Sequence, residues 1–117
     1  MYKLYLDDIR FPRMTYPTTS NDDWVIARNY DNFVHLLTTR GLPFIVSFDH
    51  DLADEHYFPE TDPANYTEKT GMDCAKFMVE YCMNNGKALP KWRVHSANPI
   101  GAENIRSYLD AFERSRG

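Results

Sequence analysis

The chain has no long apolar run and only two cysteines. No run approaches the ~20 apolar residues of a membrane-spanning helix, and the opening MYKLYLDDIR carries acids where a signal peptide has its apolar stretch. Cys74 and Cys82 would lie roughly 12 Å apart along a helix axis, too far for a disulfide within one helix. We therefore expect a soluble, cytoplasmic protein with reduced cysteines.

The chain also lacks an excess of positive charge, which argues against a general nucleic-acid-binding protein. The 117 residues include 13 Lys and Arg against 17 Asp and Glu, a formal net charge of -4 at pH 7, and no basic stripe is interleaved with aromatic residues. Seven of the acids fall between Asp49 and Glu68, a stretch without Lys or Arg. That stretch either lies in solvent or gathers around cations, and we interpret most of its acids as parts of a solvated loop.

What the chain does have is an alternation of strand and helix patterns. Its length predicts one domain, residues 1–117. The run 44–48 has no polar face, which is typical of a central parallel strand covered on both sides. Strands are predicted at 3–6, 24–27, 44–48 and 92–97, and helices at 31–40, 72–84 and 102–112. The chain is therefore predicted to be an α/β domain with a mostly parallel sheet of about four strands.

Acids and other polar residues follow three of these strands. The carboxyl ends of parallel strands meet at one edge of a sheet, where such domains carry their sites. We therefore expect these side chains on a shared rim: Asp7, Asp8, Asp49, Asp51, His95, Ser96 and Asn98. Carboxylates from two strands would raise each other's pKa unless a cation lay between them, and oxygen-only ligands suit Mg²⁺. The alternative is that single acids cap the turns or helices that follow them.

Four segments of the sequence resemble a known family. LDDIRFPR, SFDHDL, TGMD and HSANPIGAENI are together similar to the cyclic-phosphate processing receiver-like domain, a divergent branch of the response-regulator receivers, over nearly the whole chain. The resemblance implies a reduced flavodoxin-like three-layer sandwich. It also implies that Asp7, Asp8 and Asp49 bind a divalent metal, Mg²⁺ or Mn²⁺. Asp49 would stand where a receiver accepts a phosphoryl group, and Ser96 would contact phosphoryl oxygens.

The sequence departs from the receiver pattern in three places. Residues 10–23 contain two prolines and no apolar periodicity, so we expect a loop where a receiver has its first helix. One helix is predicted after Ser96, so the fifth strand of a receiver and its lysine are expected to be missing. Nineteen residues, 52–70, separate Asp51 from Gly71, and so long an insert beside a site is typical of a lid or a binding loop.

Histidines, arginines and an asparagine complete the candidate site. His50 and His95 can move protons near pH 7, as phosphoester cleavage requires; the alternative for each is a structural role, for His95 as a core imidazole hydrogen-bonded to backbone. Arg10, or Arg13, could grip a phosphate with its guanidinium fork. Asn98 lies just before a helix, where it either helps to hold an anion or acts as a plain N-cap.

These residues predict a metal-dependent phosphoesterase that acts on a small cyclic or terminal phosphate, such as a cyclic nucleotide or a cyclic phosphate RNA end. The metal would lower the pKa of a bound water, Asp49 could attack directly instead, and His50 or His95 would protonate the leaving oxygen. The expected partner is a small phosphorylated ligand or nucleotide, not a membrane. Two alternatives stay open: a module that binds such a ligand without cleaving it, and a degenerate receiver for signalling or protein contact.

Overall fold

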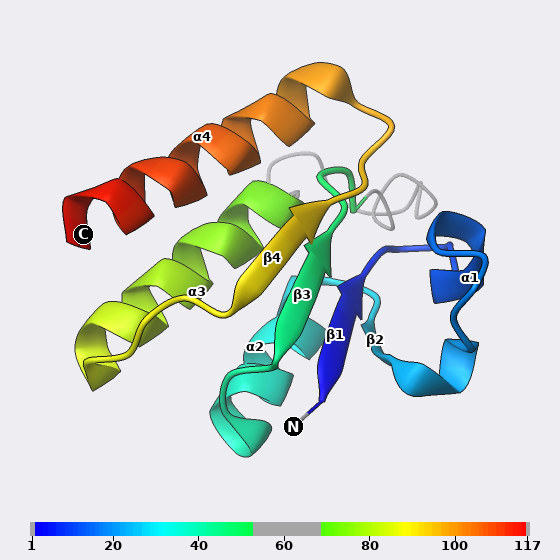
Figure 1. Cartoon of the computed structure of the whole chain (residues 1–117), viewed down its shortest axis with the longest axis horizontal. Coiled ribbons are helices and arrows are strands. Elements are labelled where there is room, and N and C mark those ends of the chain that lie inside the picture. The colour runs from blue at the N-terminus through cyan, green and yellow to red at the C-terminus, as the bar shows by residue number, and fades with distance from the viewer. Residues whose placement is uncertain (1, 53–68, 117) are drawn as a thin grey trace, which may run out of the picture.

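Four short strands form one parallel sheet in the computed structural model, which describes residues 2–52 and 69–116 (Figure 1). In sheet order the strands are β2 (Val25–Ala27), β1 (Lys3–Leu6), β3 (Ile45–Phe48) and β4 (Lys91–Val94). The registers align Leu6 with both Ala27 and Phe48, and Phe48 with Val94. The last residues of all four strands therefore lie level at one edge of the sheet.

Helices follow the strands along the chain. They are α1 (Pro12–Thr15), α2 (Tyr30–Arg40), α3 (Gly71–Asn85) and α4 (Pro99–Arg116), with a 3₁₀ turn at Asn21–Asp23. The start of α3 is fixed by a capping box between Thr70 and Asp73, and its end by Gly86, whose backbone is left-handed with a φ of 62°. The start of α2 is fixed by Asn29, whose side chain accepts the Asn32 N–H.

The main core lies on one face of the sheet. Alternate residues of β1 and β3 point toward the helices and are fully buried: Leu4, Leu6, Val46 and Phe48. The helices add buried residues to the same cluster, among them Phe33, Leu37, Ala75, Met78, Ile105 and Leu109. In Figure 1, α2 and α3 lie behind the sheet and α4 runs beside α3. The three longer helices therefore share one side of the sheet.

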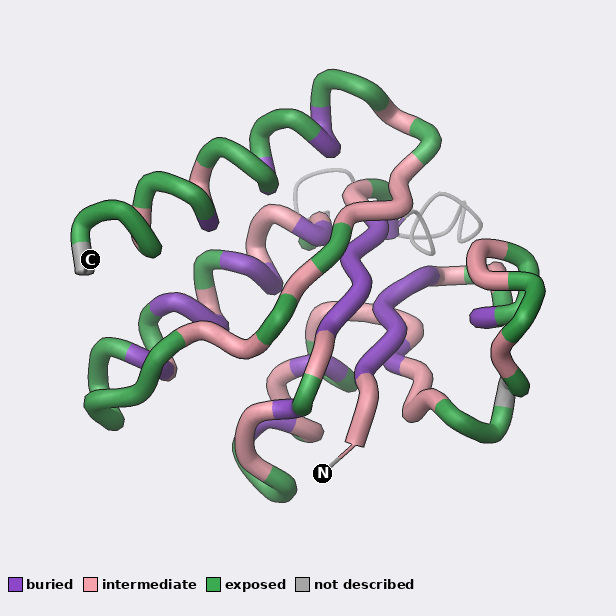
Figure 2. Tube along the Cα trace, in the orientation of Figure 1, coloured by how far each residue is buried: buried purple, intermediate pink, exposed green. Residues whose placement is uncertain are grey.

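The opposite face is covered by the segment that joins β1 to β2. Tyr5 and Ser47 alternate with the core residues of their strands and are buried beneath Tyr16 and Trp24. The Tyr16 and Trp24 rings stack with centroids 5.5 Å apart. Strand β4, next to β3 at the end of the sheet, alternates exposed and half-buried residues (Figure 2). The third layer of this reduced flavodoxin-like α/β fold therefore consists of a crossing segment with one-turn α1, in place of a full receiver helix.

The predicted elements are confirmed in type and order, with differences at their ends. Strand β4 ends at Val94, so His95 and Ser96 lie in the loop before α4 and not in a strand. The segment 10–23, expected to be a loop, contains the one-turn α1 and the 3₁₀ turn at Asn21–Asp23. Helix α1 starts at Pro12 because proline suits the first position of a helix. Of the insert 52–70, with its predicted role as a lid or binding loop, residues 53–68 lie outside the described residues. No helix that the structure describes is long and apolar enough to cross a membrane.

Candidate functional site

Three carboxylates meet at the carboxyl edge of the two central strands. Asp7 follows β1 and Asp49 follows β3, and the pairing of Leu6 with Phe48 puts these two acids side by side. The Asp49 N–H donates to the Leu6 carbonyl at 3.0 Å. One oxygen each from Asp7, Asp8 and Asp49 lies within 4.8 Å of the others, and Asp7 and Asp49 are buried. The predicted rim therefore contains a compact acidic cluster.

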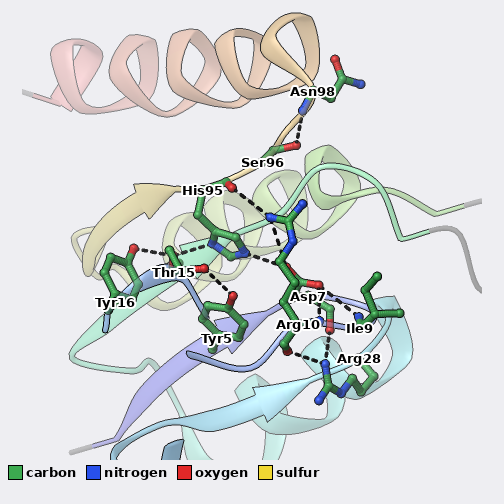
Figure 3. A network of polar contacts seen from close by, with 11 residues as sticks. Tyr5, Asp7, Ile9, Arg10, Thr15, Tyr16, Arg28, His95, Ser96 and Asn98 are labelled. Atoms are coloured by element: carbon green, nitrogen blue, oxygen red, sulfur yellow. Dashed lines mark hydrogen bonds and ion pairs between the residues drawn. The ribbon is translucent and has the colours of Figure 1, made fainter. Parts of the chain in front are cut away.

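Asp7 is held by hydrogen bonds on both of its oxygens (Figure 3). Its Oδ1 accepts the backbone N–H of Ile9 at 3.0 Å and that of Arg10 at 2.8 Å, and its Oδ2 lies 3.0 Å from His95 Nε2. Burial raises the pKa of Asp7, but the hydrogen bonds from His95 and the two backbone groups outweigh burial and lower that pKa to about 2. Asp7 is therefore a fixed anion near neutral pH.

The pKa of Asp49 is shifted upward, in the opposite direction to that of Asp7. Burial raises its pKa, and the negative charge of Asp7 raises it further. A hydrogen bond with the Ser96 hydroxyl and electrostatic interactions with His95 and Arg10 lower this pKa, but they do not restore its ordinary value. An ionised Asp49 beside an ionised Asp7 is therefore costly unless a cation neutralises the pair.

His95 is enclosed by side chains. Its own side chain is 3% exposed, and its ring stacks on Tyr5 with centroids 4.6 Å apart. His95 Nδ1 lies 2.7 Å from the Ser47 hydroxyl, which lies 2.8 Å from the Tyr16 hydroxyl. Because the ionised Asp7 only accepts hydrogen bonds, His95 Nε2 donates to it, and in the neutral ring Nδ1 accepts from Ser47. A continuous polar chain therefore runs from Tyr16 through Ser47 and His95 to Asp7.

His50 follows Asp49 in the chain, and its side chain packs against the start of α4. Its Nδ1 is 2.8 Å from Asp51 Oδ1, an oxygen that also accepts Asn98 Nδ2 at 3.3 Å. The hydrogen bond from His50 lowers the pKa of Asp51, so this carboxylate is ionised near neutral pH and His50 Nδ1 donates to it. In the neutral ring Nε2 is then unprotonated. The ring packs so closely on Gly101 that a Cβ there would lie 2.3 Å from His50 Cγ.

Gly71 packs closely against the backbone of Asp49 and His50. Gly71 is the first residue of α3, and its N–H donates to the His50 carbonyl at 2.7 Å. A Cβ at this position would lie 1.8 Å from the Asp49 carbonyl oxygen, which no side chain can tolerate without a shift of backbone. The glycine of the TGMD segment is therefore required by the close approach of α3 to the acidic cluster.

Two of the predicted substrate-binding residues lie at the cluster. Arg10 Nη1 is 3.9 Å from Asp7 Oδ2 and 3.4 Å from the His95 carbonyl. Ser96 reaches Asp49 through its hydroxyl. His95 is a buried imidazole, as the structural interpretation expected, but its partners are side chains and not backbone groups.

The other predicted residues surround the cluster. Asn98 lies just before α4, and its Oδ1 accepts the Gly101 N–H at 3.0 Å, which is the contact of an N-cap. Asp51 is exposed and contacts His50 and Asn98. Arg13 is exposed in α1. The structure therefore divides the predicted rim into an acidic cluster with Arg10, Ser96 and His95, and a second group around His50.

The sequence analysis missed Ser47, Tyr16 and Arg28. Arg28 Nη1 donates to the carbonyls of Asp7 at 3.2 Å and Arg10 at 2.6 Å, and so it fixes the loop that follows β1. Ser47 carried a signal, because it is the polar residue in the otherwise apolar strand β3. Tyr16 and Arg28 carried none, since their roles depend on how the segment between β1 and β2 crosses the sheet.

The donors of the cluster fit a divalent cation that takes oxygen ligands. The carboxylates of Asp7, Asp8 and Asp49 converge, Asp49 is only 5% exposed, and the pKa of Asp49 is raised by burial and by Asp7. The Arg10 guanidinium lies 3.9 Å from Asp7 Oδ2 and its side chain is 34% exposed, so solvent screens part of its attraction for Asp7. Mg²⁺ and Mn²⁺ suit such a set because they accept a few carboxylate oxygens and complete their shell with water and phosphate oxygens.

A parallel sheet with an acidic pair after its first strand and a third acid after the neighbouring strand defines a domain of the receiver type. The sequence model of the cyclic-phosphate processing receiver domain matches residues 2–111, and the chain belongs to this family. No curated protein and no solved structure matches the chain. The family match links the chain to cyclic phosphate.

Proposed function

We propose that the protein is a divalent-metal-dependent phosphoesterase for a small ligand with a cyclic or terminal phosphate, such as a cyclic nucleotide or the cyclic phosphate end of an RNA. The observation that carries the proposal is the convergence of the Asp7, Asp8 and Asp49 carboxylates within 4.8 Å. The family of the chain supports a cyclic phosphate as the substrate class.

Asp8 and Asp49 are the proposed holders of Mg²⁺ or Mn²⁺, with Asp7 beside them. Asp7 already accepts hydrogen bonds on both oxygens and contributes mainly negative potential. The pKa of Asp49 is raised by burial and by the Asp7 charge. The ionised form of Asp49 therefore gains most from a neighbouring positive charge. When bound, the cation would polarise the phosphorus centre and lower the pKa of a water.

Arg10 and Ser96 are the proposed phosphate-binding residues. The Arg10 guanidinium lies at the edge of the cluster with its side chain 34% exposed, so its fork can donate to phosphate oxygens from solvent. The Ser96 hydroxyl already lies beside Asp49. The amide of Asn98 is used by Gly101 and Asp51, so Asn98 would bind substrate only by giving up its 3.3 Å contact to Asp51.

His50 is the proposed proton donor to the leaving oxygen, and His95 is a positioning residue. His95 has both ring nitrogens engaged, with Ser47 and with Asp7, so it holds Asp7 in place. His50 has Nδ1 fixed by Asp51 and its side chain 18% exposed, so protonated Nε2 can donate. Direct attack by Asp49, which would form a phospho-enzyme, is the second proposed route.

One observation favours a second candidate, a non-catalytic module that binds a phosphorylated ligand or a protein partner. The enclosure of His95 leaves His50 as the sole predicted histidine available for proton transfer, and His50 lies in the group beside the cluster. An acidic cluster with Arg10 could hold a cation and a phosphate without cleaving any bond.

The test is incubation with Mn²⁺ and a panel of 2′,3′-cyclic nucleotides, cyclic dinucleotides, cyclic oligonucleotides and phosphorylated RNA ends, followed by chromatography. The wild type and the exposed-acid control Asp110→Asn should form product, and Asp49→Asn should not. His50→Gln should lower turnover by about 10²- to 10⁴-fold while ligand binding stays intact. Tight binding without product from any substrate would support the binding module, and product formation untouched by His50→Gln would leave the chemistry to Asp49 and the metal.

A further inference from the structure

Strand β4 is an open edge of the sheet. It pairs with β3 on one side, and no strand in the described part of the chain pairs with the other. The His95 N–H donates to the Phe48 carbonyl at 2.9 Å, so the period of two along a strand turns the peptide groups of Arg93 toward β3 as well. The peptide groups of Trp92 and Val94 therefore point outward and offer donors and acceptors along the edge.

Two open hollows flank this edge, with volumes of about 390 Å³ and 540 Å³. Trp92 and Arg93 line both. The smaller hollow reaches Glu113 of α4, and the larger reaches Tyr16 on the opposite face and Arg106 of α4. An extended chain beside β4 would therefore find room for its side chains on both faces.

The side chains along the edge are mostly basic. Lys91 and Arg93 are exposed on the face of β4 that turns away from the main core. Arg106 lines the larger hollow and lies 3.9 Å from Glu103 of the same helix. Lys91 and Arg93 therefore supply most of the positive charge. Glu113 lines the smaller hollow, and its Oε1 accepts the Trp92 indole N–H at 2.8 Å. The edge therefore carries positive charge in a chain whose formal net charge is -4, and it suits a negatively charged partner.

We propose that the β4 edge binds an extended acidic segment of another protein by strand addition. The added strand would pair with the peptide groups of Trp92 and Val94, and its acidic side chains would alternate so as to face Lys91 and Arg93. The apolar side chains between them would lie on the side of Trp92. This surface goes beyond the proposed phosphoesterase activity and does not depend on it.

Two other occupants fit the edge less well. A second copy of the chain, paired antiparallel through β4, would gather the Lys91 and Arg93 side chains of both copies on one face, where like charges repel. A nucleic acid would satisfy the positive charge, but it has no alternating peptide donors and acceptors to match those of Trp92 and Val94 at the spacing of a strand.

The test is a titration with a short capped synthetic peptide in which Glu alternates with Val, followed in amide NMR spectra. Binding should be saturable, with the largest shifts at the Trp92 and Val94 amides. Arg93→Glu should weaken binding by about tenfold or more. Val94→Pro removes an outward N–H at an edge position where proline is tolerated, and it should abolish binding. Lys76→Glu, exposed on α3, should bind as the wild type does.

Several results would overturn the proposal. They are no saturable binding, equal binding of a peptide with Lys in place of Glu, or binding that both Arg93→Glu and Val94→Pro leave unchanged. A peptide-free dimer that Val94→Pro dissociates, or a short single-stranded RNA that binds this edge more tightly than the peptide, would also overturn it. If Val94→Pro does not fold, Arg93→Glu decides. Asp49→Asn should bind the peptide normally, so failure of the acidic cluster would not be confused with failure here.

Discussion

At the scale of the residue, the neighbours of each carboxylate determine its charge. Asp7 and Asp49 lie side by side, yet the pKa of Asp7 is lowered to about 2 and the pKa of Asp49 is raised. The difference arises because Asp7 accepts hydrogen bonds from His95 and from two backbone N–H groups, whereas Asp49 is buried beside the Asp7 charge. Asp7 is therefore ionised near neutral pH, whereas burial and the Asp7 charge disfavour the ionised form of Asp49.

The low pKa of Asp7 predicts a loss of stability in acid. Its folded value of about 2 lies below the ordinary 3.8, so protonation favours unfolding and the contribution of Asp7, about 2 kcal/mol, is present above a pH of about 4 and lost toward a pH of about 2. Urea unfolding across this range, with EDTA present, should show a shallower pH dependence for Asp7→Asn than for wild type or Asp110→Asn. An equal slope for Asp7→Asn would contradict the role given to its hydrogen bonds.

The polar chain through Ser47 predicts a cost for a single hydroxyl. Ser47→Ala leaves the Tyr16 hydroxyl and His95 Nδ1 without their buried partner, which should lower the free energy of unfolding by about 1–3 kcal/mol. Ser107→Ala is the matched control, because that exposed hydroxyl contacts Glu103 on the helix surface and should contribute less than about 0.5 kcal/mol. Urea unfolding measures both losses. Similar losses in the two variants would contradict the role given to the hydrogen bonds of Ser47 with Tyr16 and His95.

At the scale of the element, the start of α3 and the ends of β1 and β3 form one packed unit. Gly71→Ala would drive a Cβ into the Asp49 carbonyl oxygen, so the variant should lose about 3 kcal/mol of stability. Gly86→Ala meets no atom within 4 Å and pays only for its left-handed backbone, about 1 kcal/mol. Thermal and urea unfolding of the two variants should give this order. A smaller loss for Gly71→Ala than for Gly86→Ala would contradict the close approach.

The sequence predicted the sheet and the acidic cluster because both depend on local patterns. Acids that directly follow parallel strands must share an edge once the strands pair in register, as Asp7 and Asp49 do. The surroundings of His95 could not be predicted, because its ring contacts Ser47 on a neighbouring strand, and the Ser47 hydroxyl in turn contacts Tyr16. Tyr16 lies in the segment 10–23, whose lack of apolar periodicity says nothing about its path over the sheet.

At the scale of the whole molecule, the two faces of the sheet differ. The three longer helices share the face that holds the main core, and a crossing segment covers the other face above β1. Strand β4 forms an open edge of this sheet, and the acidic cluster lies at the carboxyl ends of β1 and β3. The proposed chemistry is centred on the carboxyl rim and the proposed protein contact on the β4 edge, and the two regions meet at His95, which lines the larger hollow and contacts Asp7.

The most direct test of the acidic cluster is calorimetric titration of Mg²⁺ and Mn²⁺ into wild type, Asp49→Asn and Asp110→Asn. Wild type and Asp110→Asn should bind with equal affinity, and Asp49→Asn should bind about tenfold or more weakly. Without metal, Asp49→Asn should unfold no more easily than wild type, because its neutral amide removes a buried charge beside Asp7. Equal affinity in all three proteins would contradict the assignment of Asp7, Asp8 and Asp49 as a cation site.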